Sequence, residues 1–289
     1  MSVFKDFVKA VTSYLFCVFL ALFGLSVSFA EWITLNEINT TSPIAKNQWV
    51  ALEPRPKTSK IGEKPDELPD FSSFTRVEEK KQKFFAFMLP KIREANHKIR
   101  IERKTTNRLS ESFLNDSNMP EEDLAEVNRL RLKYKVNSQS NIGDALETLI
   151  IKIDEVPASL VLAQSANESG WGTSRFAIEA KNMFGIWCFR EGCGIKPLQR
   201  AAGGKYEVAK YGTIQESVEA YTLNINSHPA YRELRRIRSE ARADNGYPSG
   251  MALAEGLKAY SARGQEYVKE IKQLIRINKL QRFNSEDKA

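Results

Sequence analysis

The 289-residue chain contains only two histidines and three cysteines, which limits the metal chemistry open to it. His97 and His228 lie far apart in the sequence, and Cys188 and Cys193 have no second cysteine pair to complete a site. Zinc sites and metal-dependent amidases need several such ligands, and no HExxH helix is present. A GxSxG serine elbow and a phosphate-binding glycine loop are also absent. We therefore expect neither a metal nor a cofactor.

Overall hydrophobicity is also low, because a mean hydropathy of −0.41 excludes a protein with several membrane spans. An apolar run from Tyr14 to Phe23 follows Lys5 and Lys9, and small residues at Ser28 and Ala30 fit a signal-peptidase site. Residues 1–30 are therefore predicted to be an export signal. A single uncleaved membrane anchor is the alternative, because the run continues patchily to Ala30.

Export changes the interpretation of the cysteines at the ends of the CFREGC loop. In an oxidising compartment, a disulfide between Cys188 and Cys193 is the default for so short a spacing. Closing this loop would contribute about 2 kcal/mol to the free energy of unfolding.

Three further segments follow the predicted signal. Residues 31–76 contain five prolines among polar residues and predict a tether. Residues 77–136 predict a helical extension, because apolar residues recur at helical spacing, with Pro90 expected to start a new helix or to kink the first. Residues 137–283 predict a larger helical domain. The apolar residues of the extension are Phe84, Phe87, Met88, Ile92, Ala95 and Ile99.

The larger domain is expected to be mainly α-helical with one small β-lobe. Helices are predicted to begin at Pro157, at the capping box Thr213–Glu216, and at Pro229, with a long amphipathic helix over residues 264–283. Between residues 186 and 211 the pattern changes to glycines and period-two alternation. This region predicts a β-hairpin with its turn at residues 201–204.

Glu168 is the most informative single residue. In a helix that starts at Pro157 it occupies the last turn, just before Ser169-Gly170, with Trp171 beside it. The negative end of the helix dipole and an apolar neighbour both favour the neutral acid, so they raise its pKa. A glycosidase needs this property in the group that protonates the leaving oxygen. The alternative is that Glu168 is one of 36 acidic residues, bonded to nearby backbone.

The segment LAQSANESGWGTSRFA, followed by KNMFGIW, resembles the glucosaminidase branch of the lysozyme superfamily, over about residues 150–280. The resemblance implies a lysozyme-like helical domain, a groove floored by the β-lobe, and hydrolysis beside N-acetylglucosamine with Glu168 as general acid. The matching positions are Ala163, Gln164, Ala166, Glu168, Ser169, Trp171, Gly172, Ser174, Ala177, Asn182, Phe184, Gly185 and Ile186.

The sequence departs from this family at two positions. The family places a second acid on the first strand of the β-lobe, whereas residues 195–200 here contain none. Glu191 and Glu207 are the nearby candidates, with Glu207 preferred for its place on a regular strand, and the substrate's own N-acetyl group is the alternative nucleophile. The family's late tyrosine is best matched by Tyr260.

Candidate substrate-binding residues lie in and near the matched stretch, and the aromatic ones could stack on sugar rings. Phe184 and Trp187 also fit a packed turn in the core. The candidates are Gln164, Trp171, Asn182, Phe184 and Tyr206.

The predicted function is therefore hydrolysis of peptidoglycan glycan strands in the periplasm or cell envelope, by an endo-β-N-acetylglucosaminidase. The formal charge of +7 fits an anionic wall polymer, and we expect no nucleic-acid partner, although an ordinary solvated surface would explain the charge equally well. A lytic transglycosylase, an N-acetylmuramoyl amidase and a non-catalytic wall-binding module are the alternatives. The missing second acid supports the last of these.

Overall fold

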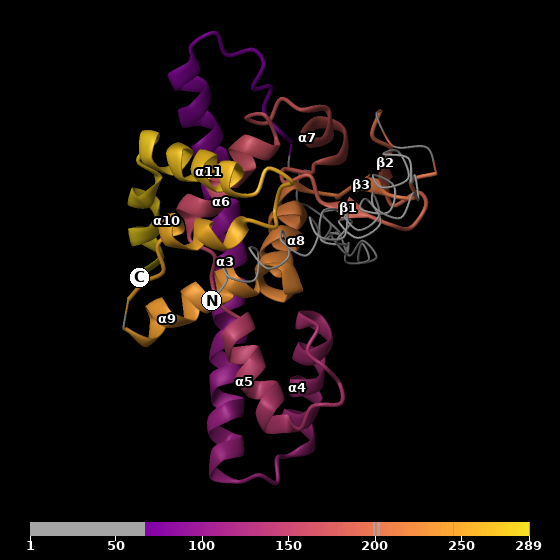
Figure 1. Cartoon of the computed structure of the whole chain (residues 1–289), viewed down its shortest axis with the longest axis vertical. Coiled ribbons are helices and arrows are strands. Elements are labelled where there is room, and N and C mark those ends of the chain that lie inside the picture. The colour runs from indigo at the N-terminus through magenta and orange to yellow at the C-terminus, as the bar shows by residue number, and fades with distance from the viewer. Residues whose placement is uncertain (1–66, 199, 201–202, 245, 289) are drawn as a thin grey trace, which may run out of the picture. The chain divides into compact units, whose positions relative to one another are not determined.

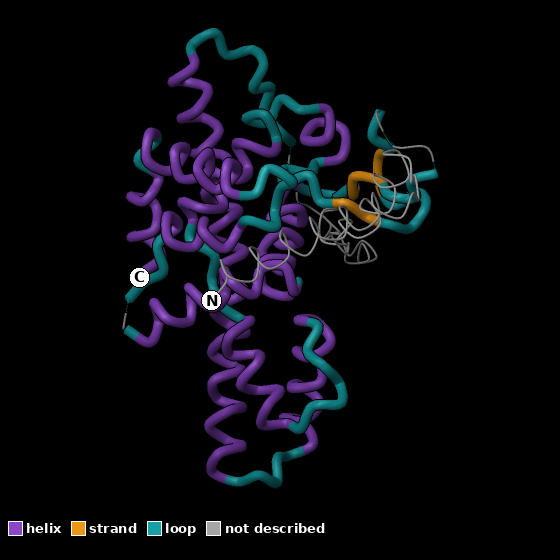
Figure 2. The backbone as a smooth tube through the Cα atoms, in the orientation of Figure 1, coloured by secondary structure: helices purple, strands orange, loops and turns teal. Residues whose placement is uncertain are grey.

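The computed structural model describes residues 67–288 except 199, 201–202 and 245. The predicted export signal and most of the predicted tether lie outside the described residues. Helices dominate the described part of the chain, and one small sheet stands to the side of them (Figures 1 and 2). None of the described helices combines the length and the apolar character that crossing a bilayer requires.

The α-helices are α3 (Val77–Asn115), α4 (Glu121–Tyr134), α5 (Ile142–Lys152), α6 (Ala158–Glu168), α7 (Arg175–Ala180), α8 (Ile214–Ser227), α9 (Arg232–Ala243), α10 (Gly250–Leu253) and α11 (Gln265–Ile277). Three 3₁₀ segments, η1 (Pro229–Tyr231), η2 (Ala254–Leu257) and η3 (Leu280–Lys288), follow α8, α10 and α11. The strands are β1 (Trp187–Cys188), β2 (Gly194–Ile195) and β3 (Glu207–Ala209).

The larger hydrophobic core surrounds α6, whose residues from Ala158 to Ala166 are all buried. Helix α6 is buried on every side because α3, α10, α11 and η3 all pack against it. The first half of α3 supplies Phe84, Met88 and Ile92 to this core. The predicted extension and the larger domain therefore share one core.

A second core lies between the later half of α3 and helices α4 and α5, which run beside one end of α3 in Figure 1. Leu109, Leu130 and Leu149 are buried there, one from each helix. Helix α3 is continuous through Pro90, so no new helix starts at that residue. Buried Met88 and Ile92, one on each side of Pro90, hold this stretch against the larger core although the proline lacks an N–H.

The small sheet is antiparallel, with strand order β1-β3-β2. The predicted hairpin corresponds to β2 and β3, which pair Gly194 with Ala209 and Ile195 with Val208. Two details of the prediction were wrong: the first hairpin strand ends at Ile195 rather than Arg200, and β1 adds a third strand on the other side of β3. The Cys188–Cys193 disulfide connects the end of β1 to the residue just before β2, and so links the two outer strands.

Candidate active site

Glu168 is the last residue of α6, as the sequence predicts. The chain then makes a tight turn in which Gly170, Trp171 and Gly172 all have positive φ angles, of 57°, 61° and 78°. Trp171 is a bulky residue in the left-handed region, which costs free energy and is maintained here by packing. At Gly172 a Cβ atom would lie 2.5 Å from the Phe71 ring, so only glycine fits. This turn ends α6 immediately after the carboxylate.

A hydrogen bond from α11 holds the Glu168 side chain. The Tyr267 hydroxyl donates to Oε1 of Glu168 at 2.8 Å, and it accepts from Nε2 of Gln164 at 2.9 Å. Oε1 of Gln164 in turn accepts from the Tyr221 hydroxyl of α8. Three helices therefore meet in one directional chain of hydrogen bonds that ends on the carboxylate. Gln164 and both tyrosines are buried, so each polar atom in the chain has a partner that replaces water.

The surroundings of Glu168 raise its pKa above the ordinary value, chiefly because the partly buried carboxylate is poorly hydrated. Hydrogen bonds from Tyr267 and from the Asn167 amide, and the positive charge of Arg263, act in the opposite direction without cancelling that effect. The negative charge of Glu270 adds to the upward shift. These surroundings therefore shift Glu168 toward its neutral form.

The second carboxylate oxygen, Oε2, faces the turn before β1. A Cβ atom at Gly185 would stand 4.0 Å from Oε2, and Gly185 has a φ of 64° that side chains rarely adopt. The absence of a side chain at this position keeps the turn clear of the carboxylate. Oε1 is held by Tyr267, so Oε2 is the oxygen that faces this turn.

The Asn182 side chain holds the turn before β1 in place. Its Oδ1 accepts from the N–H groups of Phe184 and Ile186, and its Nδ2 donates to the carbonyls of Ile186 and Ala209. The side chain is 1% exposed and uses both amide hydrogens and both lone pairs on backbone groups. Asn182 therefore lies beneath the site and joins the turn to β3, and it does not reach the surface where substrate would bind.

Phe184 and Tyr260 also lie beneath the site. The Phe184 ring is buried and stacks on Tyr221 with 4.1 Å between ring centroids. The Tyr260 hydroxyl donates to the Phe184 carbonyl at 3.0 Å, and its ring stacks on Tyr267 at 5.2 Å. Tyr260, the tyrosine chosen from the sequence, thus supports the site, while Tyr267 contacts the carboxylate.

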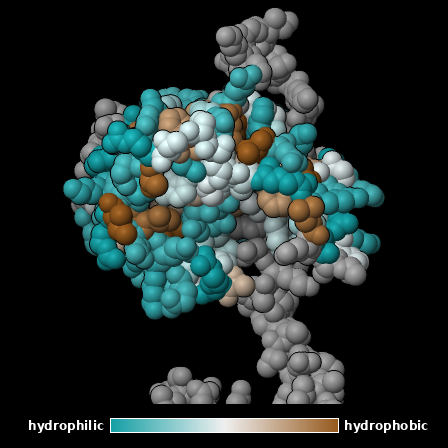
Figure 3. Space-filling model, turned by 90° about the horizontal axis from the view of Figure 1, so that it is seen from above, coloured by the Kyte–Doolittle hydropathy of each residue, from teal (hydrophilic) through white to brown (hydrophobic). Residues whose placement is uncertain are grey.

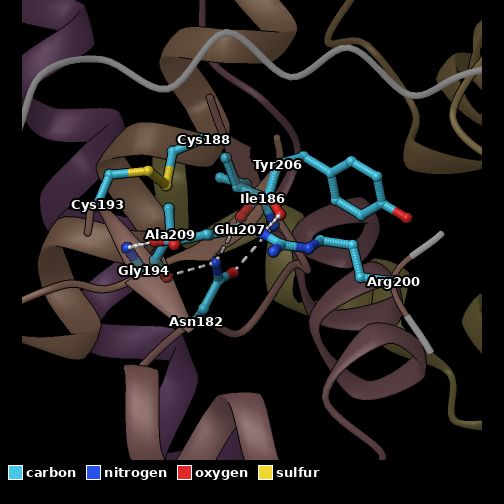
Figure 4. Close-up of a disulfide and its surroundings, with 9 residues drawn as sticks. All are labelled: Asn182, Ile186, Cys188, Cys193, Gly194, Arg200, Tyr206, Glu207 and Ala209. Atoms are coloured by element: carbon cyan, nitrogen blue, oxygen red, sulfur yellow. Dashed lines mark hydrogen bonds between the residues drawn. A yellow bond between two sulfur atoms is a disulfide. The ribbon is translucent and has the colours of Figure 1, made fainter. Parts of the chain in front are cut away.

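Glu207, the preferred second acid, lies inside the β-lobe (Figure 4). Its side chain is 2% exposed, and its Oε2 accepts from the Gly194 N–H at 2.9 Å. The carboxylate thus holds β2 against β3 beside the Cys188–Cys193 disulfide. Glu191, the other candidate, is exposed in the disulfide loop.

Two of the aromatic candidates, Tyr206 and Trp171, lie in different parts of the structure. Tyr206 stacks on Trp187 with ring centroids 4.3 Å apart, and in Figure 4 its ring points away from the disulfide. Both rings are partly exposed, so they form an aromatic surface on the β-lobe. Trp171 lies on the α3 side instead, in edge contacts with Phe84 and Phe85.

Among the described residues, one set of His, Cys, Asp and Glu side chains is close enough together to suggest a metal site: Cys188, Cys193 and Glu207, with ligand atoms within 4.8 Å of one another. Both sulfur atoms belong to the disulfide, so this set offers no thiolate. Its geometry does not fit a zinc centre.

Tyr267 is the site residue that sequence reasoning missed. It lies 99 positions after Glu168, at the start of a helix whose buried face also contains Val268, Ile271 and Ile275. A tyrosine in such a stripe is usually a core residue, and its hydroxyl partner depends on how α11 packs on α6. The sequence offered one signal for Tyr267: it lies close to Tyr260, near the end of the domain that contains Glu168.

Comparison with known proteins identifies the family of this chain. Residues 148–280 match the family model for glucosaminidase, described as mannosyl-glycoprotein endo-β-N-acetylglucosaminidase. The chain is 30% identical to protein Bax of Escherichia coli K12 over 211 residues, which cover 72% of this chain and 73% of Bax. The catalytic domain of the autolysin Auto from Listeria monocytogenes aligns at 16% identity with a TM-score of 0.40, over 73% of this chain and 92% of that domain. Because the relationship to Bax spans most of both chains and the family model surrounds Glu168, this chain belongs to the glucosaminidase family of glycoside hydrolases.

Proposed function

We propose that the protein is a peptidoglycan hydrolase that cleaves glycan strands as an endo-β-N-acetylglucosaminidase, with Glu168 as the general acid. The observation that carries the proposal is the environment of one carboxyl group. Oε1 of Glu168 is held by a buried tyrosine, Oε2 faces a turn that lacks a side chain, and poor hydration raises the pKa. These are the properties that protonation of a glycosidic oxygen requires.

In the proposed reaction, Oε2 of Glu168 carries the proton and transfers it to the glycosidic oxygen as the bond to the sugar breaks. The hydroxyl of Tyr267 remains hydrogen-bonded to Oε1 and stabilises the carboxylate that forms. Gln164 and Tyr221 act as positioning residues, because they orient the tyrosine without reaching the substrate.

The second catalytic group is proposed to be the N-acetyl group of the substrate. The carboxylate of Glu207 is buried and bonded to the Gly194 N–H, so using it as a base would break the contact that holds β2. Attack by the substrate's own acetamide oxygen needs no second carboxylate from the protein. If Glu207→Gln, Glu191→Gln and the double variant all retain the native rate, the acetamide is the better account. A large loss in Glu191→Gln alone would oppose it.

Substrate contact on the β-lobe is proposed for Tyr206, whose partly exposed ring is braced by Trp187. Asn182, Phe184 and Tyr260 are proposed to act beneath the site, because the hydrogen bonds and ring contacts given above occupy their polar atoms or rings. Because the proposed substrate is the cell wall, the protein is proposed to act in the periplasm or cell envelope.

A lytic transglycosylase is the second candidate, because it also acts through a single glutamate and the described β-lobe offers no free buried second acid. Product analysis separates the two. Purified sacculi would be digested with the protein, and the soluble fragments examined by mass spectrometry before and after borohydride reduction. The proposal expects reducing N-acetylglucosamine ends. Ends in 1,6-anhydromuramic acid would indicate a transglycosylase, free stem peptides an amidase, and no soluble products a binding module.

A further inference from the structure

A pocket of about 440 Å³ lies on the side of α6 formed by the beginning of α3 and by α11. Volumes of this size are typical of sites for small organic ligands. Charged, amide and apolar side chains share its wall, and the apolar ones are Ala166, Trp171 and residues of α11. The lining residues used below are Lys81, Asn167, Trp171, Glu270, Gln273 and Leu274.

The pocket adjoins the catalytic carboxyl. Nδ2 of Asn167, which lines the pocket, donates to Oε1 of Glu168 at 3.4 Å, the same oxygen that Tyr267 holds. A ligand in the pocket would therefore lie next to Asn167, which donates to the same carboxylate oxygen as Tyr267. A group attached to the sugar at the cleaved bond could extend into this space.

The wall offers both signs of charge together with carboxamides. Lys81 of α3 is 21% exposed and bonds to Glu78 at 3.1 Å, and Glu270 of α11 is paired with Arg263. Asn167 and Gln273 supply amide groups, which match the donors and acceptors of a peptide backbone. A ligand that carries an ammonium group, a carboxylate and amide bonds would use all of them.

The aromatic residue of the pocket does not favour a sugar. The Trp171 ring is in edge contact with Phe84 and Phe85, and the Lys81 ammonium lies 5.8 Å from its centroid. Phe84, Phe85 and Lys81 thus surround part of this ring and leave less of it open for a sugar to stack on. Figure 3 shows the molecule from above, and on that face the hydrophobic side chains stand in small separate groups among hydrophilic ones. A polar ligand therefore suits this face better than an apolar partner.

We propose that this pocket binds the peptide attached to the glycan strand, with Lys81 recognising a carboxylate and Glu270 an ammonium group. The inference rests on the proposed action on peptidoglycan and adds a preference for glycan that still carries its peptides. A stem peptide that contains diaminopimelate has a free end with one ammonium and one carboxylate, and is joined to the sugar through amide bonds.

Binding is tested without hydrolysis, using the full-length Glu168→Gln protein and the free tripeptide L-alanyl-γ-D-glutamyl-meso-diaminopimelate. Calorimetry gives the affinity, and the indole N–H resonance of Trp171, identified with Trp171→Phe, reports on the pocket. We expect the tripeptide to shift this resonance, and Lys81→Gln to weaken binding about tenfold, because a hydrogen bond to a charged group is lost. Lys83 is an exposed lysine of α3 outside the pocket, so adding Lys83→Gln should leave the affinity for the tripeptide as it is in the Glu168→Gln protein. Absence of binding, or equal weakening by both substitutions, would overturn the proposal.

A second measurement compares kcat/KM for peptide-bearing glycan and for glycan stripped of its peptides by an amidase. The native protein and Lys83→Gln should prefer the peptide-bearing strand, and Lys81→Gln should bring the ratio toward one. A ratio of one in the native protein contradicts the pocket proposal while leaving glycan hydrolysis intact. If neither strand is cleaved, the proposed function fails, and the tripeptide titration still decides whether the pocket binds peptide.

Discussion

The Tyr267 hydroxyl donates a hydrogen bond of 2.8 Å to Oε1 of Glu168 across 99 residues of sequence. The hydroxyl has one hydrogen, and its orientation is settled because Nε2 of Gln164 donates to the same oxygen. Tyr267 therefore acts as a fixed donor toward the carboxylate. This hydrogen bond determines the changes in activity that we predict for Tyr267→Phe and Gln164→Met.

The Tyr267→Phe variant should shift the basic limb of the pH–rate profile to higher pH. The tyrosine's hydrogen bond favours the charged form of Glu168 and so lowers the carboxyl pKa, and removing it lets burial raise that pKa further. A general acid works only while protonated, so activity should persist to higher pH, with kcat at the optimum reduced about tenfold by the lost donor.

The matched control is Tyr134→Phe, which removes a buried tyrosine hydroxyl that donates to Glu102 in the second core. It should affect the free energy of unfolding without moving the pH–rate profile. A Tyr267→Phe profile that keeps its basic limb, or moves it to lower pH, would contradict the assigned hydrogen bond.

The Gln164→Met variant should weaken both stability and catalysis. It keeps the size of a fully buried side chain but leaves the Tyr221 hydroxyl without its acceptor, at a cost of about 1–3 kcal/mol in the free energy of unfolding. Tyr267 loses the group that orients it, so the effects of Gln164→Met and Tyr267→Phe on kcat should not add in the double variant. Urea unfolding and steady-state kinetics measure both quantities, and additive effects on kcat would argue against the chain of hydrogen bonds.

The Glu168→Gln variant should be more stable than the native protein at neutral pH, with the difference shrinking as the pH falls. The pKa of Glu168 in the folded protein is raised above its ordinary value of 4.5, so the folded state retains a proton that the unfolded chain has lost. Native stability therefore falls as pH rises through the interval between 4.5 and the raised value. Glutamine does not titrate, so the difference between the two unfolding curves isolates this carboxyl. A difference that is constant with pH, or that grows toward acid, would contradict the raised pKa.

Replacing both Cys188 and Cys193 by alanine should lower the free energy of unfolding by about 2 kcal/mol, the value expected for so short a closed loop. The bond connects β1 to the residue just before β2, so the loss should concentrate in the β-lobe, where Glu207 and Gly194 are also held together. Amide hydrogen exchange should show faster opening of β2 and β3 than of α6. Uniformly faster exchange throughout the described helices would instead indicate that the disulfide stabilises the whole fold.

Much of the local structure follows from the sequence because local signals determine it. Pro157 stands at the start of α6, and the Thr213 hydroxyl caps α8 by accepting from the Glu216 N–H. Glu168 occupies the last turn of its helix, and the disulfide joins the expected pair. In each case the residues that carry the signal lie within a few positions of the feature they predict.

The remaining features depend on contacts between distant segments. Tyr267 reaches Glu168 only because α11 packs on α6, and nothing near Tyr267 distinguishes it from Tyr260. Strand β1 is only two residues long and forms by pairing with β3. So short a segment shows no alternating sequence pattern, so this strand could not be predicted. Glu207 was the preferred second acid because of its place on a regular strand, yet it is buried and its carboxylate accepts from the Gly194 N–H.

The most direct test of the account is the rate of glycan hydrolysis by Glu168→Gln, with Glu179→Gln as the matched control on the exposed face of α7. Glutamine preserves size and can still accept the Tyr267 hydrogen bond, but it has no proton to transfer. The account predicts a loss of roughly 10²–10⁴-fold in kcat for Glu168→Gln and a native rate for Glu179→Gln, with both variants folded by circular dichroism. A Glu168→Gln protein that releases glycan fragments from sacculi at close to the native rate would contradict it.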